Sequence, residues 1–360
     1  MMNTAAGITG VQAVLIAADL AAVIGKTLKI KTGSIIATLV VILVVALLAL
    51  GAFAYLQWCK RLFVKIFGRT KPMPKVDRSP KEIDQSTIYG RGRNWFYTNR
   101  NEYINVRIDS FDKTKLSGYF RPAADRSARF AVILLHGWNE HPSEMAAYAR
   151  LMMRQMECHV LIAHQRAHGM SGGKYCTFGI YESVDLLRWM EFIKQQVGHD
   201  CKIFVVGRST GAVTALLSAQ QPEFPSNVAG IIADCPFDTL EHVLLNQSRK
   251  RYNFEFKLPL KTVDTILNKK FGFGMDKCDA AIHAGRIRVP VLVFQAGDDT
   301  VAPPEGARRI YDNIKTPKRL VAVDHAAHVM CYDKAPAVYE REVRKFVEQC
   351  VVRLVSRGQM

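Results

Sequence analysis

The stretch that most constrains the fold is Cys201–Leu216, where an apolar run meets a helix-compatible run through Gly-Arg-Ser-Thr-Gly. A turn this sharp between a strand and a helix accepts only small residues at Gly207 and Gly211. It lifts Ser209 out of the sheet and sets it at a helix N-terminus, where backbone N–H groups can face developing negative charge. The sequence therefore predicts an α/β fold and makes Ser209 the candidate nucleophile.

A candidate acid follows a second apolar run. Val289–Gln295 predicts a buried strand, and Asp298 and Asp299 stand just past its end. Carboxylates in this position lie at the sheet edge where ligands bind in open α/β folds. The alternative is that both aspartates are ordinary turn residues, since Asp is common in turns.

A candidate base follows a third predicted strand, Arg319–Val323, which runs into His325 and His328. A serine nucleophile needs a base, and the base needs an orienting acid. Either histidine taken alone is better explained as a surface or satisfied core residue. The order serine, acid, histidine, with each residue at the end of a predicted strand, favours catalysis.

An oxyanion hole is predicted upstream, after the apolar strand Phe130–Leu135. The next residues are His136, Gly137, Trp138 and Asn139. Backbone N–H groups after such a His-Gly, with Trp138 as the candidate, can act together with the N–H of Thr210. In the alternative interpretation His136 only supports the loop by hydrogen bonding.

Strand and helix patterns alternate from residue 130 to residue 233, which predicts a mainly parallel sheet with helices on both faces. Before them, Glu102–Pro122 alternates around Asp112 and Lys113 and predicts an antiparallel hairpin that opens the sheet.

With these motifs in place, residues 94–350 resemble the α/β-hydrolase superfamily, and within it membrane-anchored bacterial hydrolases of the serine aminopeptidase and monoglyceride-lipase-like branch. The resemblance implies Asp299 rather than Asp298 as the acid, and His328 rather than His325 as the base. One departure is His164, which stands where the family pattern usually has a loop-bracing Asp. The matching stretches are Leu135–Trp138, Gln165–Ser171, Gly179–Asp185, Gly207–Gly211, Ile232–Phe237, Gly297–Pro303 and Ala326–His328.

The N-terminal region predicts a membrane anchor. Residues 33–58 carry no charge, and residues 35–56 are almost wholly apolar, which matches the roughly 20 residues that a transmembrane helix needs. A core helix would have a polar face, and a signal peptide would have a basic start and a shorter apolar run. The second apolar stretch, residues 8–24, is a second span, an interfacial helix or part of a short tail.

The predicted organisation has three parts. Residues 1–57 form the membrane-anchoring segment, with the span at about 35–56, and residues 58–93 form a basic juxtamembrane linker. Residues 94–350 form the α/β-hydrolase domain. Its pattern breaks at about 240–287, which is either a cap over the active site or a set of ordinary helices on the sheet.

The net charge of +17 is concentrated beside the predicted anchor. Lys and Arg outnumber Asp and Glu by 17 to 7 over residues 58–130. Anionic lipid headgroups are the expected partner of such a segment, and no nucleic-acid recognition motif is present. Six basic residues follow the span (Lys60, Arg61, Lys65, Arg69, Lys71 and Lys75) and three precede it (Lys26, Lys29 and Lys31). The excess predicts a cytoplasmic catalytic domain, whereas the resemblance implies an outward-facing one.

The eight cysteines show no Cys-x-x-Cys spacing, and the histidines show no metal-ligand spacing. We therefore predict no metal and no cofactor. The expected activity is cleavage of a carboxylic ester, with a lipid-like or other small-molecule substrate, through Ser209, His328 and Asp299. A serine aminopeptidase or thioesterase on the same fold, and a non-catalytic membrane-tethered binding protein, are the alternatives.

Overall fold

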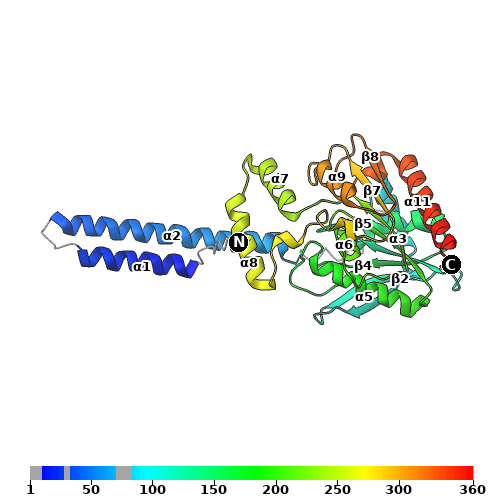
Figure 1. Ribbon diagram of the computed structural model, residues 1–360, viewed down its shortest axis with the longest axis horizontal. Helices are drawn as coiled ribbons and strands as arrows, with labels where there is room; N and C mark the ends of the chain where they lie inside the picture. Colours follow the sequence, from blue (N-terminus) through cyan, green and yellow to red (C-terminus); the bar gives the residue numbers. More distant parts are fainter. Residues whose placement is uncertain (1–9, 28–32, 70–82, 360) are drawn as a thin grey trace. The chain divides into compact units, whose positions relative to one another are not determined.

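The computed structural model describes residues 10–27, 33–69 and 83–359. The chain divides into two units (Figure 1). The helical unit comprises the described residues up to Ile66 together with Phe256–Gly274. The sheet unit comprises Phe67–Glu255 and the described residues from Met275 onward. Each unit is described by itself below.

The sheet unit is built on one eight-stranded sheet with the order β1-β2-β4-β3-β5-β6-β7-β8. The pairs β1·β2 and β2·β4 are antiparallel, and every other neighbouring pair is parallel. The predicted hairpin is confirmed, with Lys113 taking a left-handed φ of 65° in its turn. The strands are β1 Ile104–Asp109, β2 Lys115–Arg121, β3 Phe130–Leu135, β4 His159–Ala163, β5 Lys202–Arg208, β6 Val228–Asp234, β7 Val291–Ala296 and β8 Lys318–Val323.

Helices cover both faces of this sheet, as predicted (Figure 1). Those of the sheet unit are α3 Ile88–Thr98, α4 Ala146–Gln155, α5 Ile180–Val197, α6 Thr210–Ala219, α7 Leu240–Tyr252, α9 Pro304–Asn313, α10 Cys331–Lys334 and α11 Pro336–Ser356. Short 3-10 turns occupy Arg100–Glu102, Pro142–Met145, Met275–Lys277 and Ala284–Arg286.

The two faces follow from the period of two along a strand. Val132 and Leu134 of β3, and Phe204 and Val206 of β5, join one core cluster that includes buried residues of α4 and α11. The intervening side chain Ile133 is also fully buried, so it packs on the opposite face. Strands buried on both faces need continuous apolar sequences, which is why these runs do not alternate.

The helical unit contains the helices α1 Gly10–Thr27, α2 Gly33–Phe67 and α8 Lys257–Phe271. The last residue of α2, Phe67, already belongs to the sheet unit. The described part of α2 includes Ile36–Phe67, whose apolar window has a mean hydropathy of 3.0 and none of its residues buried. By length and composition it is the one described helix that can cross a membrane. The apolar stretch of α1, Leu15–Ile24, is shorter.

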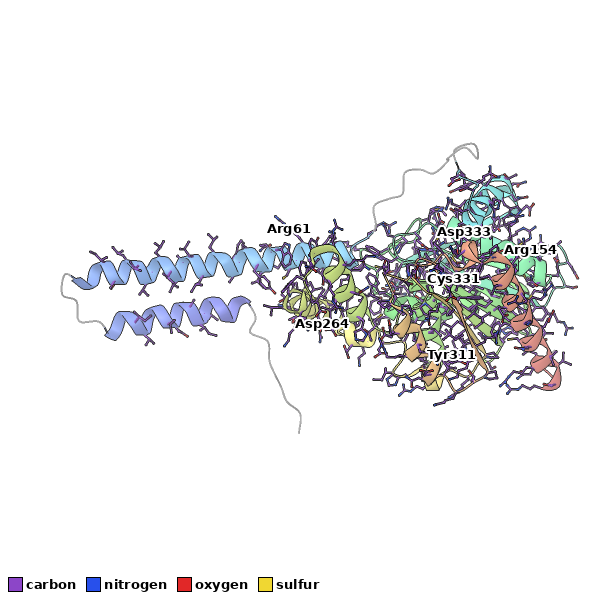
Figure 2. All side chains as sticks on the ribbon, turned by 90° about the horizontal axis from the view of Figure 1, so that it is seen from above. Arg61, Arg154, Asp264, Tyr311, Cys331 and Asp333 are labelled. Atoms are coloured by element: carbon purple, nitrogen blue, oxygen red, sulfur yellow. The ribbon has the colours of Figure 1, made fainter. Side chains whose placement is uncertain are left out.

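Helix α8 packs on the C-terminal part of α2. The Trp58 and Phe256 rings meet edge to face at 5.6 Å, and the Tyr55 hydroxyl lies 3.0 Å from Thr262 Oγ1. On α2, Cys59 is fully buried. Figure 2 shows the side chains of both helices, with Arg61 labelled on α2 and Asp264 on α8.

Two helices extend into the predicted linker, residues 58–93. Helix α2 continues to Phe67, into the predicted linker, and α3 begins within that linker at Ile88. Of the linker, residues 70–82, with Lys71 and Lys75, lie outside the described part. The predicted cap contains α7, which belongs to the sheet unit, and α8, which belongs to the helical unit.

Candidate active site

Ser209 stands at the turn between β5 and α6 with φ 52° and ψ −116°. The two flanking glycines are sterically required. A Cβ on Gly207 would lie 2.3 Å from the carbonyl oxygen of Gly211, and a Cβ on Gly211 would lie 2.2 Å from the carbonyl oxygen of Leu135. The Ser209 N–H donates to the carbonyl of Asp234 at 2.8 Å, which fixes the turn to the end of β6.

The structure brings Ser209, His328 and Asp299 together from three separate strand ends. His328 Nε2 lies 2.9 Å from Ser209 Oγ, and His328 Nδ1 lies 2.6 Å from Asp299 Oδ2. An ionised carboxylate only accepts hydrogen bonds. The Nδ1 of His328 therefore carries the proton, and Nε2 is free to accept the proton of the serine hydroxyl.

Asp299 is buried and held at both oxygens. Its Oδ1 accepts the backbone N–H groups of Val301 and Ala302 at 2.9 and 2.8 Å, while Oδ2 faces His328. The side chains of Asp298 and His325 are 64% and 80% exposed and lie 3.5 Å from each other. The second-choice acid and base thus form a surface pair, and neither has a recorded contact with Ser209.

The loop after β3 packs directly on the elbow, because Gly211 closely approaches the backbone of Leu135 and His136. Further along, Asn139 adopts φ 58° and its N–H donates to His168 Nε2 at 3.0 Å. The Trp138 ring is partly exposed and stacks on Phe178 at 5.9 Å. This geometry puts the Trp138 peptide on the same loop that contacts the start of α6, where Thr210 is the first residue.

His136 supports this loop by hydrogen bonding. Its Nδ1 lies 2.8 Å from the carbonyl of Gly137, and its Nε2 accepts the N–H of Gln165 at 3.1 Å. Complete burial, aided by the nearby His168, lowers the pKa of His136 well below its ordinary value. The imidazole is therefore neutral, with Nδ1 as its donor and Nε2 as its acceptor.

Arg208, inside the elbow sequence, is a buried cation beneath the loop. Its guanidinium lies 3.2 Å from Glu140 and 3.9 Å from Glu144, and 4.6 Å from the centre of the Tyr89 ring. Burial by itself would lower the pKa of Arg208, but these carboxylates raise it above its ordinary value. Glu140 also accepts the N–H of Gly137 at 2.7 Å, so the ion pair ties the elbow to the loop.

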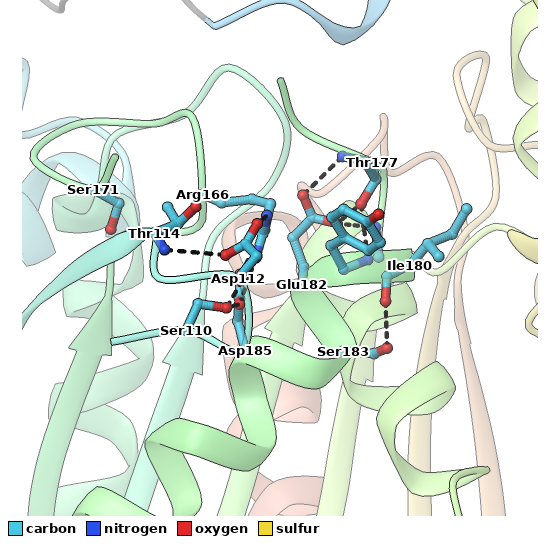
Figure 3. A network of polar contacts seen from close by, with 12 residues as sticks. Ser110, Asp112, Thr114, Arg166, Ser171, Thr177, Ile180, Glu182, Ser183 and Asp185 are labelled. Carbon is cyan, nitrogen blue, oxygen red and sulfur yellow. Dashed lines mark hydrogen bonds and ion pairs between the residues drawn. The ribbon is translucent and has the colours of Figure 1, made fainter. Parts of the chain in front are cut away.

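The loop after β4 is braced by Arg166 (Figure 3). The guanidinium binds both oxygens of Asp185 at 2.7 Å, Asp112 Oδ2 at 2.9 Å and Ser110 Oγ at 3.0 Å. Asp185 therefore braces this loop through Arg166. Glu182 instead accepts hydrogen bonds from the N–H groups of Thr177 and Gly179 and from the Thr177 hydroxyl.

His164, which departs from the family pattern, also braces this loop. Its Nδ1 accepts the N–H of Met170 at 3.1 Å, and its ring meets Tyr119 edge to face at 4.7 Å. Burial, aided by the neighbouring His141 and Arg100, lowers the pKa of His164 to about 3. The neutral imidazole of His164 thus accepts the hydrogen bond that braces the loop, in the position where the family pattern usually has an aspartate.

Among the described residues, two groups could present metal ligands, and both include Cys235. One is Asp234, Cys235 and Cys331, and the other is Cys235, Asp299 and His328. The Sγ atoms of Cys235 and Cys331 lie 3.6 Å apart. Asp234 already accepts hydrogen bonds from the hydroxyls of Tyr148 and Tyr339, at 2.7 and 3.0 Å. Its carboxylate is therefore satisfied by protein groups.

Sequence reasoning assigned no role to His168 or to the Arg208–Glu140 pair. His168 lies in the stretch Gln165–Ser171, whose resemblance to the family was the one signal available. Arg208 occupies the variable position of the elbow, and Glu140 lies 68 residues away in sequence. The sequence around Arg208 and around Glu140 contains no pattern that predicts the contact between their side chains.

The sheet order, the elbow and the serine, aspartate and histidine at successive strand ends define an α/β-hydrolase-fold serine hydrolase. The chain belongs to the family described as "Serine aminopeptidase, S33", whose model matches residues 126–269 and 274–335. It is 30% identical over 217 residues to the uncharacterized protein YqkD of Bacillus subtilis, covering 60% of this chain and 70% of that protein. It is 23% identical over 290 residues to Rv2307c of Mycobacterium tuberculosis, covering 80% and 87%.

Solved structures share the fold. The Pyrococcus furiosus esterase Pf2001 superposes with a TM-score of 0.57 at 22% identity, covering 79% of this chain and 98% of that one. Est1E from Butyrivibrio proteoclasticus, solved with ferulic acid bound, superposes with a TM-score of 0.51 at 18% identity, covering 69% and 99%. At these identities the likeness establishes the α/β-hydrolase architecture.

Proposed function

We propose that this protein is a membrane-anchored serine hydrolase that cleaves carboxylic esters with an acyl or lipid-like group. The observation that carries the proposal is the continuous hydrogen-bonded chain from Ser209 through His328 to Asp299, at 2.9 and 2.6 Å. Those distances match the hydrogen-bond reach that a nucleophile and its base require.

In the proposed reaction, Ser209 Oγ attacks the ester carbonyl while His328 Nε2 takes the hydroxyl proton. Asp299 holds the tautomer and stabilises the imidazolium that forms. The protonated His328 then gives its proton to the departing alkoxide, which leaves as an alcohol, and the acyl group stays on Ser209 as an acyl-serine. In the second half, His328 takes a proton from water, and the resulting hydroxide attacks the acyl carbonyl. The bond to Ser209 Oγ breaks, the carboxylic acid leaves, and His328 returns the proton to Ser209 Oγ.

The negative charge on the tetrahedral intermediate is assigned to the N–H groups of Trp138 and Thr210. Thr210 opens α6, and the first N–H groups of a helix have no partner within it. Neither N–H takes part in the backbone hydrogen bonds of the described turns, loops and helix caps. Fixed donors aimed at a developing oxyanion are worth about 10²–10³ in rate each.

Membrane anchoring is supported by the exposure of α2. Large apolar side chains such as Leu39, Leu43, Leu47 and Phe53 are all more than half exposed. A core helix of a soluble protein would bury at least one face, whereas a bilayer-spanning helix is apolar all round. Lys60, Arg61 and Lys65 follow the uncharged run and favour a cytoplasmic sheet unit.

A serine aminopeptidase is the second candidate, because the family model carries that description. Such an enzyme needs an anionic group near the nucleophile to bind the ammonium of its substrate. Two carboxylates follow β3 close to the elbow, Glu140 and Glu144. Glu140 is ion-paired with Arg208, and Glu144 with Arg93. This pairing favours the esterase over the aminopeptidase.

The test uses the full chain in neutral detergent with two substrate series, p-nitrophenyl esters of rising chain length and aminoacyl p-nitroanilides. We expect ester turnover, covalent labelling by a fluorophosphonate probe, and loss of both in Ser209→Ala. Turnover of the anilides alone would replace the esterase by the aminopeptidase. An unlabelled wild-type chain without turnover would instead support the non-catalytic binding protein.

A further inference from the structure

A cavity lies in the sheet unit, away from Ser209. Its volume is about 660 Å³, within the range of small-molecule sites. It is lined by the end of α6 and the loop after it, by the segment before β7, and by the last turns of α11. Val228, the first residue of β6, and Pro290, which precedes β7, form part of its wall.

This cavity is at the opposite edge of the sheet from the candidate active site. Strands β6 and β7 are parallel, and the cavity lies where they begin, whereas Asp299 follows the end of β7. A strand of six residues such as β7 spans about 20 Å. A ligand in this cavity therefore cannot be the ester under attack by Ser209.

The charged lining of the cavity is of one sign. Four arginines contribute, Arg286, Arg288, Arg353 and Arg357, and no Asp or Glu is present in the lining, all of which belongs to the described part of the chain. None of the four guanidinium groups forms an ion pair or a side-chain hydrogen bond with another described residue. By contrast, Arg319 of β8 is paired with Glu342 at 2.5 Å.

Helix electrostatics explain only half of this cluster. Arg353 and Arg357 lie at the C-terminal end of α11, where cations complement the helix dipole. Arg286 and Arg288 lie in the segment before β7, next to a three-residue 3-10 turn and not at the end of a long helix such as α11. Arg286, Arg288 and Arg357 are solvent-exposed and Arg353 is half-buried, so an anion can enter the cavity from solvent and be attracted by all four charges.

We propose that this cavity binds a small molecule that carries two phosphate groups on an apolar or aromatic body. Arginine presents a planar fork that matches phosphate oxygens in pairs. A phosphate monoester carries about −1.5 to −2 charges at neutral pH, so two of them balance four guanidinium groups. Phe224, Val289 and Leu354 form an apolar wall that suits the rest of the molecule.

The decisive experiment titrates inorganic pyrophosphate, and ADP as an organic bisphosphate, into the full chain in neutral detergent at physiological salt, measured by calorimetry. We expect wild-type binding with Kd below about 1 mM, tighter for ADP. The double substitution Arg286→Glu with Arg353→Glu should weaken binding at least tenfold. The matched control is Arg344→Glu, also on α11 but nine residues before Arg353. At 3.6 residues per turn it lies half a turn away, on the other side of the helix, and should stay within twofold of wild type.

Absence of wild-type binding up to 5 mM pyrophosphate and ADP, or an equal loss in Arg344→Glu, would overturn the proposal. If the double Glu variant does not fold, as judged by fluorophosphonate labelling, Arg288→Gln with Arg357→Gln decides in its place, with the same tenfold expectation. Repeating the titration in micelles that contain a phosphoinositide bisphosphate identifies the source of the phosphates. A rise in apparent Kd for the wild type indicates a lipid headgroup, and an unchanged Kd indicates a soluble ligand.

Discussion

At the scale of single residues, the candidate site separates groups that touch the reaction from groups that hold them. Ser209, His328 and Asp299 form the hydrogen-bonded chain. His168 and Glu140 instead hold the loop that carries Trp138, by accepting the backbone N–H groups of Asn139 and Gly137. The two sets should therefore differ in what their substitutions do to kcat.

Asp299→Asn should lower kcat by on the order of 10³ or more, because an amide no longer fixes the tautomer of His328 or stabilises its cationic form. Asp298→Asn is the matched control, since its side chain is exposed and meets only His325. Ester turnover by the two variants decides the assignment. A larger loss in Asp298→Asn than in Asp299→Asn would move the acid by one residue.

His168→Ala should lower kcat about tenfold to hundredfold with little change in KM, because the loop loses the acceptor for the Asn139 N–H and small misplacements of donors are costly. The control is His159→Ala, a buried histidine that bonds to Ala123 and Ala128. That variant should lose stability but keep kcat. Equal kcat losses in both would reduce His168 to a general packing role.

At the scale of elements, loops rather than helices or strands carry the chemistry, and the loop after β4 is the most heavily braced. It combines the Arg166–Asp185 pair with the neutral acceptor His164 (Figure 3). Arg69 adds donors from the segment after α2, to the carbonyls of Gly169 and Ser171 at 2.6 Å each.

The buried His164 makes stability depend on pH. Its pKa falls to about 3 in the folded chain from about 6.5 unfolded, so the unfolded chain binds the extra proton between those values. The contribution of neutral His164 to the free energy of unfolding is fully present above pH 6.5 and is lost as the pH falls toward 3. His164→Asn keeps an acceptor for Met170 and should reduce the slope by about 1.4 kcal/mol per pH unit. The melting temperature of both proteins from pH 7 to 5 checks this, and parallel slopes would contradict it.

Strand positions, Ser209 as the candidate nucleophile, and the strand ends expected to carry its acid and base could be predicted because they depend on local pattern. Apolar runs ending in Gly, Asp or His are visible in sequence, as at Leu135 and Ala296. The Cys235–Cys331 approach and the Arg208–Glu140 pair could not, since each joins segments far apart in the chain. Asp299 could be chosen over Asp298 only through the family resemblance, because both follow the same strand.

At the scale of the whole molecule, the described chain consists of two units joined by three crossings. One crossing is at the end of α2, and the others flank α8. Since α8 packs on α2 through Phe256 and Thr262, loss of the anchor from the chain would remove these contacts from α8. Leu260, Val263 and Leu267 on that helix are buried.

The anchor proposal predicts that the full chain stays in the membrane fraction through a carbonate wash. Leu43→Lys with Leu47→Lys should release a substantial part of it, because a lysine near the centre of a span costs about 2.5–3.5 kcal/mol. Ile282→Lys with Val352→Lys places the same charges on exposed apolar positions of the sheet unit and should leave retention unchanged. Complete extraction of the unmodified chain by carbonate would rule out the span.

The side of the membrane is tested with protease added to intact cells. The proposed cytoplasmic location predicts that the sheet unit is protected until the cells are opened. Digestion of the sheet unit from outside would reverse the orientation and leave the assignment of Ser209 untouched.

The backbone of Ser209 lies at φ 52° and ψ −116°, a conformation that glycine adopts freely and that costs other residues about 1–3 kcal/mol. Ser209→Gly should therefore raise the melting temperature above that of Ser209→Ala, while both variants lose turnover. Equal melting temperatures would show that the turn is not strained.

The strained backbone at Ser209 has an evolutionary consequence. A descendant of this protein that no longer needed the reaction would gain stability by drifting to glycine at position 209, and selection for folding alone would favour that change. The backbone at position 209 thus favours glycine on stability grounds, and a serine there is what a proposed role in chemistry predicts.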